Sequence, residues 1–368
     1  MKRILLAGYG NIAHAFERIL HEQEPYDSYV LTTCDLADGD DVMEYLPQHA
    51  DEFDLVFNSS LANSIELTRM CIRLGLDYID VGIEDGIGNI AATPSDYSSL
   101  LREMTGWKTR SRIMLGFGIN PGILEYVYQK YKPSGPHYAF ELEHDDACSP
   151  EHRVFGTWSP FMYAEEAVFA EKVVVGRGGT KIVDSLLEEA GGTMTLNYHG
   201  QRRHYLPIHH EELTSMMMSC PDLRGAAYLF QAPKGLQDYC LRRGHSLTQY
   251  QIFSIPVPQN LQGEDHVGML FWDGGEELYW VKNTTRNQAT WLRYGVNAVC
   301  WQTATGAWVA YRLLDHVRPD HPHTMTELSM LMPLQIEAQL ARIGMIFHRE
   351  DHPFDLSEFK RNIISYFD

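Results

Sequence analysis

Short apolar runs alternate with helix-like stretches over the first third of the chain. Strands are predicted at residues 3–7, 29–34, 55–58, 78–81 and 112–115. Helices are predicted between them, for example at residues 12–22 and 64–74, and Gly75 is a C-terminal stop signal for the second. Strands that alternate with helices are typical of a parallel sheet covered on both faces. We therefore expect an α/β fold whose first part is a Rossmann-type doubly wound parallel sheet.

The pattern changes after the Pro- and Gly-containing break at residues 132–136. Runs in which apolar and polar residues alternate follow at residues 137–144, 171–175, 193–198, 266–272 and 277–282. This alternation is typical of antiparallel strands with one buried face. It predicts a second, α+β domain built on a mostly antiparallel sheet.

A helical period returns from Gly295, with apolar positions on one face of residues 298–313. Two further helices are expected at residues 330–344 and 356–366, and the His-rich stretch 316–323, which contains two prolines, is expected to be a loop. The predicted organisation is a nucleotide-binding domain at residues 1–132, a substrate and dimerisation domain at 133–294, and a helical return segment at 295–368 that packs on the first domain.

The turn after the first predicted strand has the G-x-G-x-x-A spacing of a dinucleotide-binding loop. Gly8 permits a tight turn, Gly10 lets phosphate oxygens approach the backbone, and the small Ala13 lets helix and strand pack closely. The predicted cofactor-binding residues of this turn are Gly8, Gly10, Asn11, Ile12 and Ala13.

Asp35 directly follows the second predicted strand and lies 22 residues after Ala13. A carboxylate at this place holds the 2′-hydroxyl of an adenosine ribose and repels a 2′-phosphate, which favours NAD over NADP. The alternative interpretation is that the glycines only form a tight bend and that Asp35 is an ordinary turn residue.

The balance of charges argues against two classes of partner. The formal net charge is −19, from 49 acidic and 30 basic residues, so a nucleic acid or an anionic membrane is not expected. A cationic small molecule fits better, and the alternative is that the acidic surface serves solubility alone. The opening apolar stretch is too short for a signal or spanning segment, and no run of about 18 apolar residues follows, so a cytoplasmic protein is expected.

The six cysteines lack C-x-x-C spacing, which indicates reduced thiols and no zinc site, and no metal is predicted.

Polar residues that follow the parallel strands are candidates for the ligand crevice, because ligands bind beyond the carboxyl ends of such strands. Asn58 and Ser59 follow the third strand, Glu84 the fourth and Asn120 the fifth. Asn120 could bind the nicotinamide carboxamide or a substrate amine, or could instead cap the helix that starts near Pro121.

A second polar group of residues belongs to the second domain. Glu141 and Glu143 share one strand face, Trp158 precedes a helix that carries Glu165 and Glu166, and a histidine-glutamate run opens another helix. Taken one by one, each of these side chains is as readily explained by an ordinary core or solvated position.

Taken in order, the motifs resemble the homospermidine synthase branch of the saccharopine dehydrogenase-like family. The motifs are G-Y-G-N-I-A at residues 8–13, Y-I-D-V-G-I-E at 78–84, G-I-N-P-G at 118–122, E-L-E-H-D at 141–145, T-W-S at 157–159 with Glu166 beyond it, and I-H-H-E at 208–211. The resemblance spans nearly the whole chain.

The resemblance implies an NAD-dependent enzyme that oxidises a putrescine-like diamine, condenses the product with a second amine and reduces the new imine. It implies a homodimer and the following site: Glu143 and Glu166 hold ammonium groups, Trp158 stabilises an iminium cation, His209 transfers a proton, Asn120 joins the catalytic set, and Glu84 and Glu211 join the substrate pocket. Ala62 departs from the pattern, since the family carries an aspartate at the matching place.

Two other functions stay open at this point. One is a carboxyspermidine- or saccharopine-type reductase, which would condense an amine with an aldehyde or keto acid, use NADPH, and need an arginine for the substrate carboxylate. Four arginines of the second domain are available for that role: Arg153, Arg177, Arg202 and Arg203. The other is a regulator that binds NAD without catalysis.

Overall fold

The computed structural model describes residues 1–82, 106–189 and 192–367, and the chain forms two compact units. Unit 1 consists of Met1–Tyr126 and Cys300–Met345, and unit 2 of Val127–Val299 and Ile346–Asp368. Each unit therefore combines two separate stretches of the sequence. The chain passes from one unit to the other within the helices α5 (Ile123–Tyr131) and α12 (Ala298–Leu313), and again between Met345 and Ile346.

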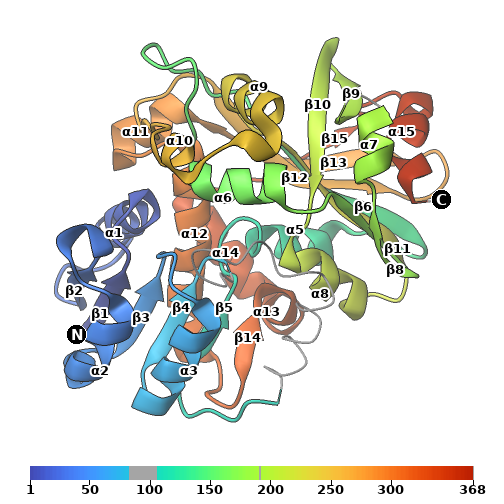
Figure 1. Ribbon diagram of the computed structural model, residues 1–368. Coiled ribbons are helices and arrows are strands. Elements are labelled where there is room, and N and C mark those ends of the chain that lie inside the picture. The colour runs from blue at the N-terminus through green and yellow to red at the C-terminus, as the bar shows by residue number, and fades with distance from the viewer. Residues whose placement is uncertain (83–105, 190–191, 368) are drawn as a thin grey trace. The chain divides into compact units, whose positions relative to one another are not determined.

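Unit 1 contains a six-stranded sheet in which every pairing is parallel (Figure 1). The strand order is β14-β5-β4-β3-β1-β2. The strands are β1 (Lys2–Ala7), β2 (Tyr29–Cys34), β3 (Leu55–Asn58), β4 (Asp77–Asp80), β5 (Ile113–Leu115) and β14 (Pro322–Thr324). The predicted doubly wound parallel sheet is confirmed. The order reverses between β1 and β3, which is where such sheets bind ligands.

The edge strand β14 corrects one expectation. Residues 316–323 were expected to form a loop, but Pro322–Thr324 pairs with β5, with Pro322 opposite Ile113. An edge strand tolerates proline because one side of it needs no ladder hydrogen bond. The local prolines therefore did not exclude a strand here.

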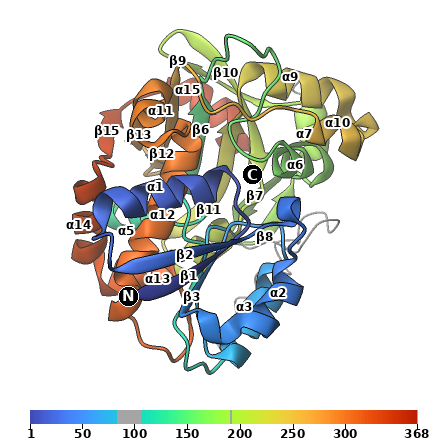
Figure 2. The same cartoon turned by 90° about the vertical axis from the view of Figure 1, so that its left-hand side faces the viewer.

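Helices cover both faces of the unit 1 sheet. They are α1 (Asn11–Gln23), α2 (Val42–His49), α3 (Ser64–Leu74), α13 (Met325–Leu331), α14 (Pro333–Ile343) and most of α12. Figure 2 shows α1 running along β1 and β2, and its Phe16 ring stacks on Phe57 of β3 at 4.3 Å between centroids. In α12, Gly306 lies so close to the Gly118 carbonyl oxygen that no Cβ would fit there. The loop after β5 is thus shaped by a helix from the distant end of the chain.

Unit 2 is built on a second sheet with the order β15-β13-β12-β6-β11-β10-β9, and the hairpin β7–β8 pairs with β11. Its strands are β6 (His137–Asp145), β7 (Val173–Gly176), β8 (Gly179–Ile182), β9 (Met194–Tyr198), β10 (Gln201–Ile208), β11 (Leu223–Gln231), β12 (Glu264–Trp272), β13 (Leu278–Arg286) and β15 (His348–Asp351). Only the β6–β11 pairing is parallel among these described strands. The predicted mostly antiparallel second sheet is confirmed.

The helices of unit 2 lie between these strands. They are α6 (Pro160–Ala164), which continues into a π-helical turn (Glu165–Phe169), α7 (Asp184–Glu189), α8 (Glu211–Ser219), α9 (Lys234–Arg243), α10 (Gln249–Phe253), α11 (Asn287–Tyr294) and α15 (Leu356–Asn362).

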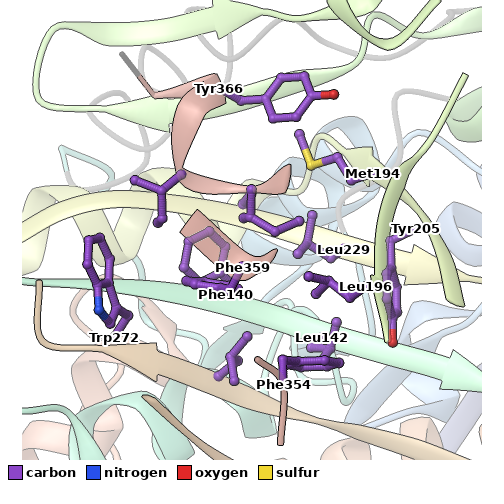
Figure 3. Packing of buried hydrophobic residues seen from close by; sticks show 14 of the residues in the cluster. Phe140, Leu142, Met194, Leu196, Tyr205, Leu229, Trp272, Phe354, Phe359 and Tyr366 are labelled. Atoms are coloured by element: carbon purple, nitrogen blue, oxygen red, sulfur yellow. The ribbon is translucent and has the colours of Figure 1, made fainter. Parts of the chain in front are cut away.

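The end of the chain differs from the expectation that residues 295–368 pack as one segment on the first domain. β15 pairs with β13, and the aromatic side chains after it join the core of unit 2. Figure 3 shows Phe359 beside Phe140 of β6, and the two rings meet edge to face at 5.3 Å. These aromatic side chains cover the apolar face of the mixed sheet, which would otherwise be exposed to water.

None of the helices in the described part of the chain has the length and apolar character needed to cross a membrane. All six cysteines carry free thiols.

Candidate functional site

The glycine-rich turn of unit 1 has the backbone geometry of a phosphate-binding loop. Gly8 adopts a left-handed φ of 79°, and a Cβ there would lie 2.8 Å from the Ser60 Cα, so only glycine fits. A Cβ on Gly10 would meet nothing within 4 Å, and Gly10 caps α1 without any side-chain hydrogen bond. The first N–H groups of α1 therefore stay available to an anion that approaches over Gly10.

Asp35 lies against the same turn. Its carboxylate accepts the backbone N–H of Tyr9 and, at 2.7 Å, that of Ala37. The acid predicted at the end of β2 is thus held beside the glycine-rich loop, where a carboxylate can reach an adenosine ribose.

Asn58 and Ser59 shape this loop from β3. The buried Asn58 amide donates to the Tyr78 hydroxyl at 2.9 Å and accepts from the Ser60 hydroxyl at 2.7 Å. The Ser59 hydroxyl donates to the Gly8 carbonyl oxygen at 3.2 Å. Both side chains have internal partners that fix the turn, and their contact with the cofactor stays a prediction.

The loop after β5 is fixed by hydrogen bonds to β4 and within itself. The Gly116 N–H donates to Asp80 at 2.6 Å, and the Gly118 N–H donates to the Pro121 carbonyl oxygen at 2.8 Å. α5 begins at Ile123 rather than near Pro121, so Asn120 is not adjacent to its first residue. Glu84 lies outside the described residues.

Unit 2 assembles an acidic cluster around His210, at the start of α8. The His210 Nδ1 lies 3.1 Å from Glu212 Oε1, and its Nε2 lies 3.9 Å from Glu166 Oε1. The His210 ring packs on Tyr228 of β11 at 4.5 Å, and the Tyr228 hydroxyl donates to Glu143 at 2.8 Å. His210 and Tyr228 thus connect two residues that were predicted for the site, Glu143 of β6 and Glu166 of the π-helical turn after α6.

Further carboxylates complete the cluster. One ligand atom each from Glu141, His210 and Glu212 lies within 4.8 Å of the others, and Glu141 is fully buried. Glu211, the first residue of α8, lies near enough to act electrostatically on Glu166 and His210. Because buried carboxylates outnumber the imidazoles here, the cluster favours a bound cation.

The surroundings raise the pKa values of both Glu166 and His210, for different physical reasons. Burial raises the pKa of Glu166 to about 7, in spite of the nearby His210. Burial also acts against a charge on His210, but the carboxylates of Glu212 and Glu166 outweigh it and raise its pKa to about 10. His210 is therefore cationic at neutral pH, and Glu166 is the group of the pair that titrates near pH 7.

His209 differs from the sequence-based expectation that its imidazole titrates near neutrality. Burial, followed by the charge of His210, lowers the pKa of His209 to about 4. Its Nε2 is buried and has no hydrogen-bond partner among the residues that the structure describes. The imidazole is therefore neutral at pH 7, and its Nε2 can accept a hydrogen bond from a donor.

Trp158 is half-buried and is held by its neighbours in sequence. The Thr157 hydroxyl donates to Asp145 at 2.6 Å, the Thr157 carbonyl oxygen accepts from Asn297 at 2.7 Å, and Ser159 caps α6. Asp145 ends β6, two residues after Glu143, so the tryptophan is anchored to the strand that carries the acidic cluster.

Sequence reasoning missed His210, Glu212 and Tyr228. His210 and Glu212 belong to the same histidine-glutamate run as the predicted His209 and Glu211, but the change from strand to helix at this point hides which side chains point inward. Tyr228 lies on β11, and only the parallel pairing of β11 with β6 brings it to Glu143.

The arginines considered for a substrate carboxylate are not in this cluster. Arg203 donates from both terminal nitrogens to Asp146, and Arg153, Arg177 and Arg202 are exposed.

The fold and the local geometry together define a class of protein. In this class, a doubly wound parallel sheet with a glycine-rich first turn is joined in one chain to a unit with a mixed sheet. No protein-family model matches the chain, and no curated protein sequence matches it.

Solved structures do match. Homospermidine synthase from Legionella pneumophila, in complex with NAD, superposes with a TM-score of 0.72 at 14% identity, covering 95% of this chain and 91% of that one. The apo form of saccharopine dehydrogenase (L-Glu forming) from Saccharomyces cerevisiae gives a TM-score of 0.63 at 12% identity, covering 95% and 100%. The resemblance inferred from the sequence motifs is thus confirmed at the level of the fold.

Proposed function

We propose that the protein is an NAD-dependent oxidoreductase that acts on amines and joins two of them into a secondary amine, as a homospermidine synthase does. The observation that carries this proposal is the buried acidic cluster of unit 2, in which Glu143, Glu166 and Glu212 surround a single cationic histidine. The fold shared with homospermidine synthase, solved with NAD bound, supports it.

The turn from Gly8 to Ala13 fits NAD. The open space over Gly10, the uncapped N-terminus of α1 and the carboxylate of Asp35 offer a place for the pyrophosphate and for the ribose. When bound, NAD would accept a hydride from the carbon that bears the first amine and, as NADH, would return it to the imine that forms once the second amine has displaced ammonia.

The residues of unit 2 would bind the diamine. Glu143 and Glu166 would each take an ammonium group, since charge-assisted hydrogen bonds to carboxylates are strong in a buried setting. Trp158 would place its ring face against the carbon-nitrogen group, where a cation gains about 2 kcal/mol when it is desolvated.

We assign proton transfer to Glu166 and not to His209. An amine must be neutral before its carbon can be oxidised, and a group with a pKa of about 7 can accept that proton at neutral pH. His210, with a pKa of about 10, would stay cationic and hold the surrounding carboxylates in place. His209 would then orient the neutral amine through its Nε2, which has no hydrogen-bond partner in the part of the chain that the structure describes.

The test is an incubation of the purified protein with putrescine and NAD, with the products identified by mass spectrometry. The proposal expects a symmetric triamine without accumulation of NADH, because oxidation and reduction cancel. Turnover only with a keto acid or semialdehyde acid and NADPH would assign the protein to the reductase class instead. NAD binding without turnover of any amine would assign it to a regulator. The homodimer and the cytoplasmic location stay predictions.

A further inference from the structure

A second group of ligating side chains lies on neighbouring strands of unit 2, separate from the acidic cluster. His144 of β6 is directly opposite His266 of β12 in the strand register. Asp146 lies two residues after His144 and Glu264 two residues before His266, and the Asp146 N–H donates to the Glu264 carbonyl oxygen at 2.9 Å. Since side chains two residues apart share a sheet face, the four side chains form a two-by-two patch.

The distances within this patch suit a single ion. One ligand atom each from His144, Asp146 and His266 lies within 4.8 Å of the others. The fourth side chain adds a carboxylate oxygen, since Glu264 Oε2 lies 3.7 Å from His266 Nε2.

A hydroxyl group lies within hydrogen-bond distance of the Nδ1 of each imidazole, which leaves the Nε2 for an ion. The His144 Nδ1 lies 3.2 Å from the Tyr205 hydroxyl, and the His266 Nδ1 lies 2.9 Å from the Thr284 hydroxyl. When each Nδ1 donates to its hydroxyl, each Nε2 presents a lone pair. Metal-binding histidines are typically oriented by such a hydrogen bond on the other ring nitrogen.

An unsatisfied polar atom points to a missing ligand. His144 has an exposed fraction of 0%, and its Nε2 has no hydrogen-bond partner among the described residues. A buried nitrogen without a partner costs free energy, so such an atom calls for an explanation. The side chain of Asp146 is 36% exposed, which leaves the patch open to an ion from solution.

We propose that His144, Asp146, His266 and Glu264 form a binding site for a divalent transition metal such as Zn²⁺. Two imidazoles and two carboxylates favour Zn²⁺ over Mg²⁺ or Ca²⁺, which prefer oxygen ligands alone. The ion would join β6 to β12. This site does not depend on the amine chemistry proposed above.

The charged neighbours of the patch already have partners. Arg203 donates to Asp146, Arg286 donates to Glu264 at 2.8 Å, and Lys282 pairs with Glu350 at 2.7 Å. The carboxylate oxygens that accept these bonds keep a further lone pair for an ion.

The histidines of unit 1 make a weaker candidate. His321 and His323 lie near each other, but both bond to Glu327, and the His323 Nε2 also bonds to the Arg318 carbonyl oxygen. No ring nitrogen of that pair is left without a partner in the described structure. This pair therefore supplies a matched control.

The test uses full-length protein with Cys148→Ser, which removes the exposed thiol as a competing ligand. After chelator treatment, the protein is titrated with Co²⁺ and followed by its visible absorption, and Zn²⁺ is then added as a competitor. We expect one equivalent of Co²⁺ to bind and Zn²⁺ to displace it. His266→Gln and Asp146→Asn should each abolish the absorption band while the far-UV spectrum stays that of the folded protein.

Two further variants sharpen the result. Thr284→Val removes the hydroxyl behind His266 and should weaken Zn²⁺ binding about tenfold to hundredfold. His321→Gln should leave the binding unchanged. A band that persists in His266→Gln, a band that disappears in His321→Gln, or no Co²⁺ binding by the parent protein would each overturn the proposal.

Discussion

The glycine-rich turn of unit 1 and the acidic cluster of unit 2 are built in different ways. The turn uses consecutive backbone groups between β1 and α1, and residues such as Asp35 and Ser59 hold it from other parts of the chain. The cluster uses side chains from β6, the π-helical turn, α8 and β11, and a charged histidine ties them together. A site made of backbone depends on conformation, whereas a site made of buried side chains depends on the balance of charge.

The largest effect is expected where that balance is broken. Glu212→Gln leaves His210 without its main counter-ion, and the loss of one partner of a buried pair should lower the free energy of unfolding by about 3 kcal/mol. The pKa of His210, about 10 in the folded state against 6.5 ordinarily, should fall. Because the folded-state pKa is the higher one, the stabilisation by this pair is complete below about pH 6.5 and is lost as the pH rises toward 10.

Urea denaturation at several pH values and NMR titration of the imidazole would check this expectation. Glu211→Gln is the matched control, since it removes a neighbouring carboxylate that gives His210 a smaller electrostatic effect. An equal loss of stability in both variants would contradict the role given to Glu212.

In the turn, the corresponding test changes conformation and leaves charge alone. Gly8→Ala places a Cβ against Ser60 at a left-handed φ, which should cost about 1–3 kcal/mol of stability and abolish NAD binding. Gly10→Ala adds the same methyl group in open space, so it should keep the stability within about 0.5 kcal/mol yet still weaken NAD binding. Calorimetric titration with NAD and thermal denaturation separate the two, and unchanged NAD affinity in Gly10→Ala would remove that position from the cofactor site.

A third test asks whether unit 2 stabilises a developing charge. Trp158→Leu should lower kcat with putrescine roughly thirtyfold, which corresponds to about 2 kcal/mol, and should change KM much less. Trp158→Phe keeps an aromatic face and should recover part of the rate. A loss confined to KM would show that the ring only binds substrate.

Glu166→Gln addresses the carboxylate that titrates near neutrality. Activity of the parent protein should rise with pH through about 7, as Glu166 loses its proton and becomes able to accept one from the amine. The variant should lose this limb of the profile and bind a diamine about tenfold more weakly, with little change for an uncharged analogue. An unaltered pH profile would count against proton transfer by Glu166.

The smallest effect is expected at Asp35. Asp35→Asn keeps the size and an oxygen for the Tyr9 N–H but removes the charge that repels a 2′-phosphate. The preference for NAD over NADP should fall by about tenfold or less, as measured by the ratio of the two Kd values. An unchanged ratio would mean that the preference arises elsewhere.

The difference between the two regions also explains how much could be predicted. The prediction gave the correct bounds for two strands, Tyr29–Cys34 and Leu55–Asn58, and for the helix Ser64–Leu74. Local periodicity and stop signals determine these elements. The His-rich edge strand β14 was missed because its partner β5 lies some two hundred residues earlier in the chain. Local sequence carries no signal for such a pairing.

The site follows the same rule. Gly8, Gly10 and Asp35 could be found from spacing alone, because the turn imposes that spacing on the sequence. Asn58 follows the right strand, but its hydrogen bonds to Tyr78 and Ser60 are visible only in three dimensions. For His209 and His210, the sequence could not tell which imidazole is charged, since that depends on the carboxylates of Glu166 and Glu212.

The close approach of Gly306 to the Gly118 carbonyl oxygen has a consequence for anyone who divides this protein into fragments. A fragment ending at Tyr126 would lack the α12 backbone that packs against the loop after β5. It would also expose the edge of β5 that β14 covers. An independently folding cofactor module must therefore carry residues 300–345 as well, spliced to the first 126 by a linker in place of unit 2.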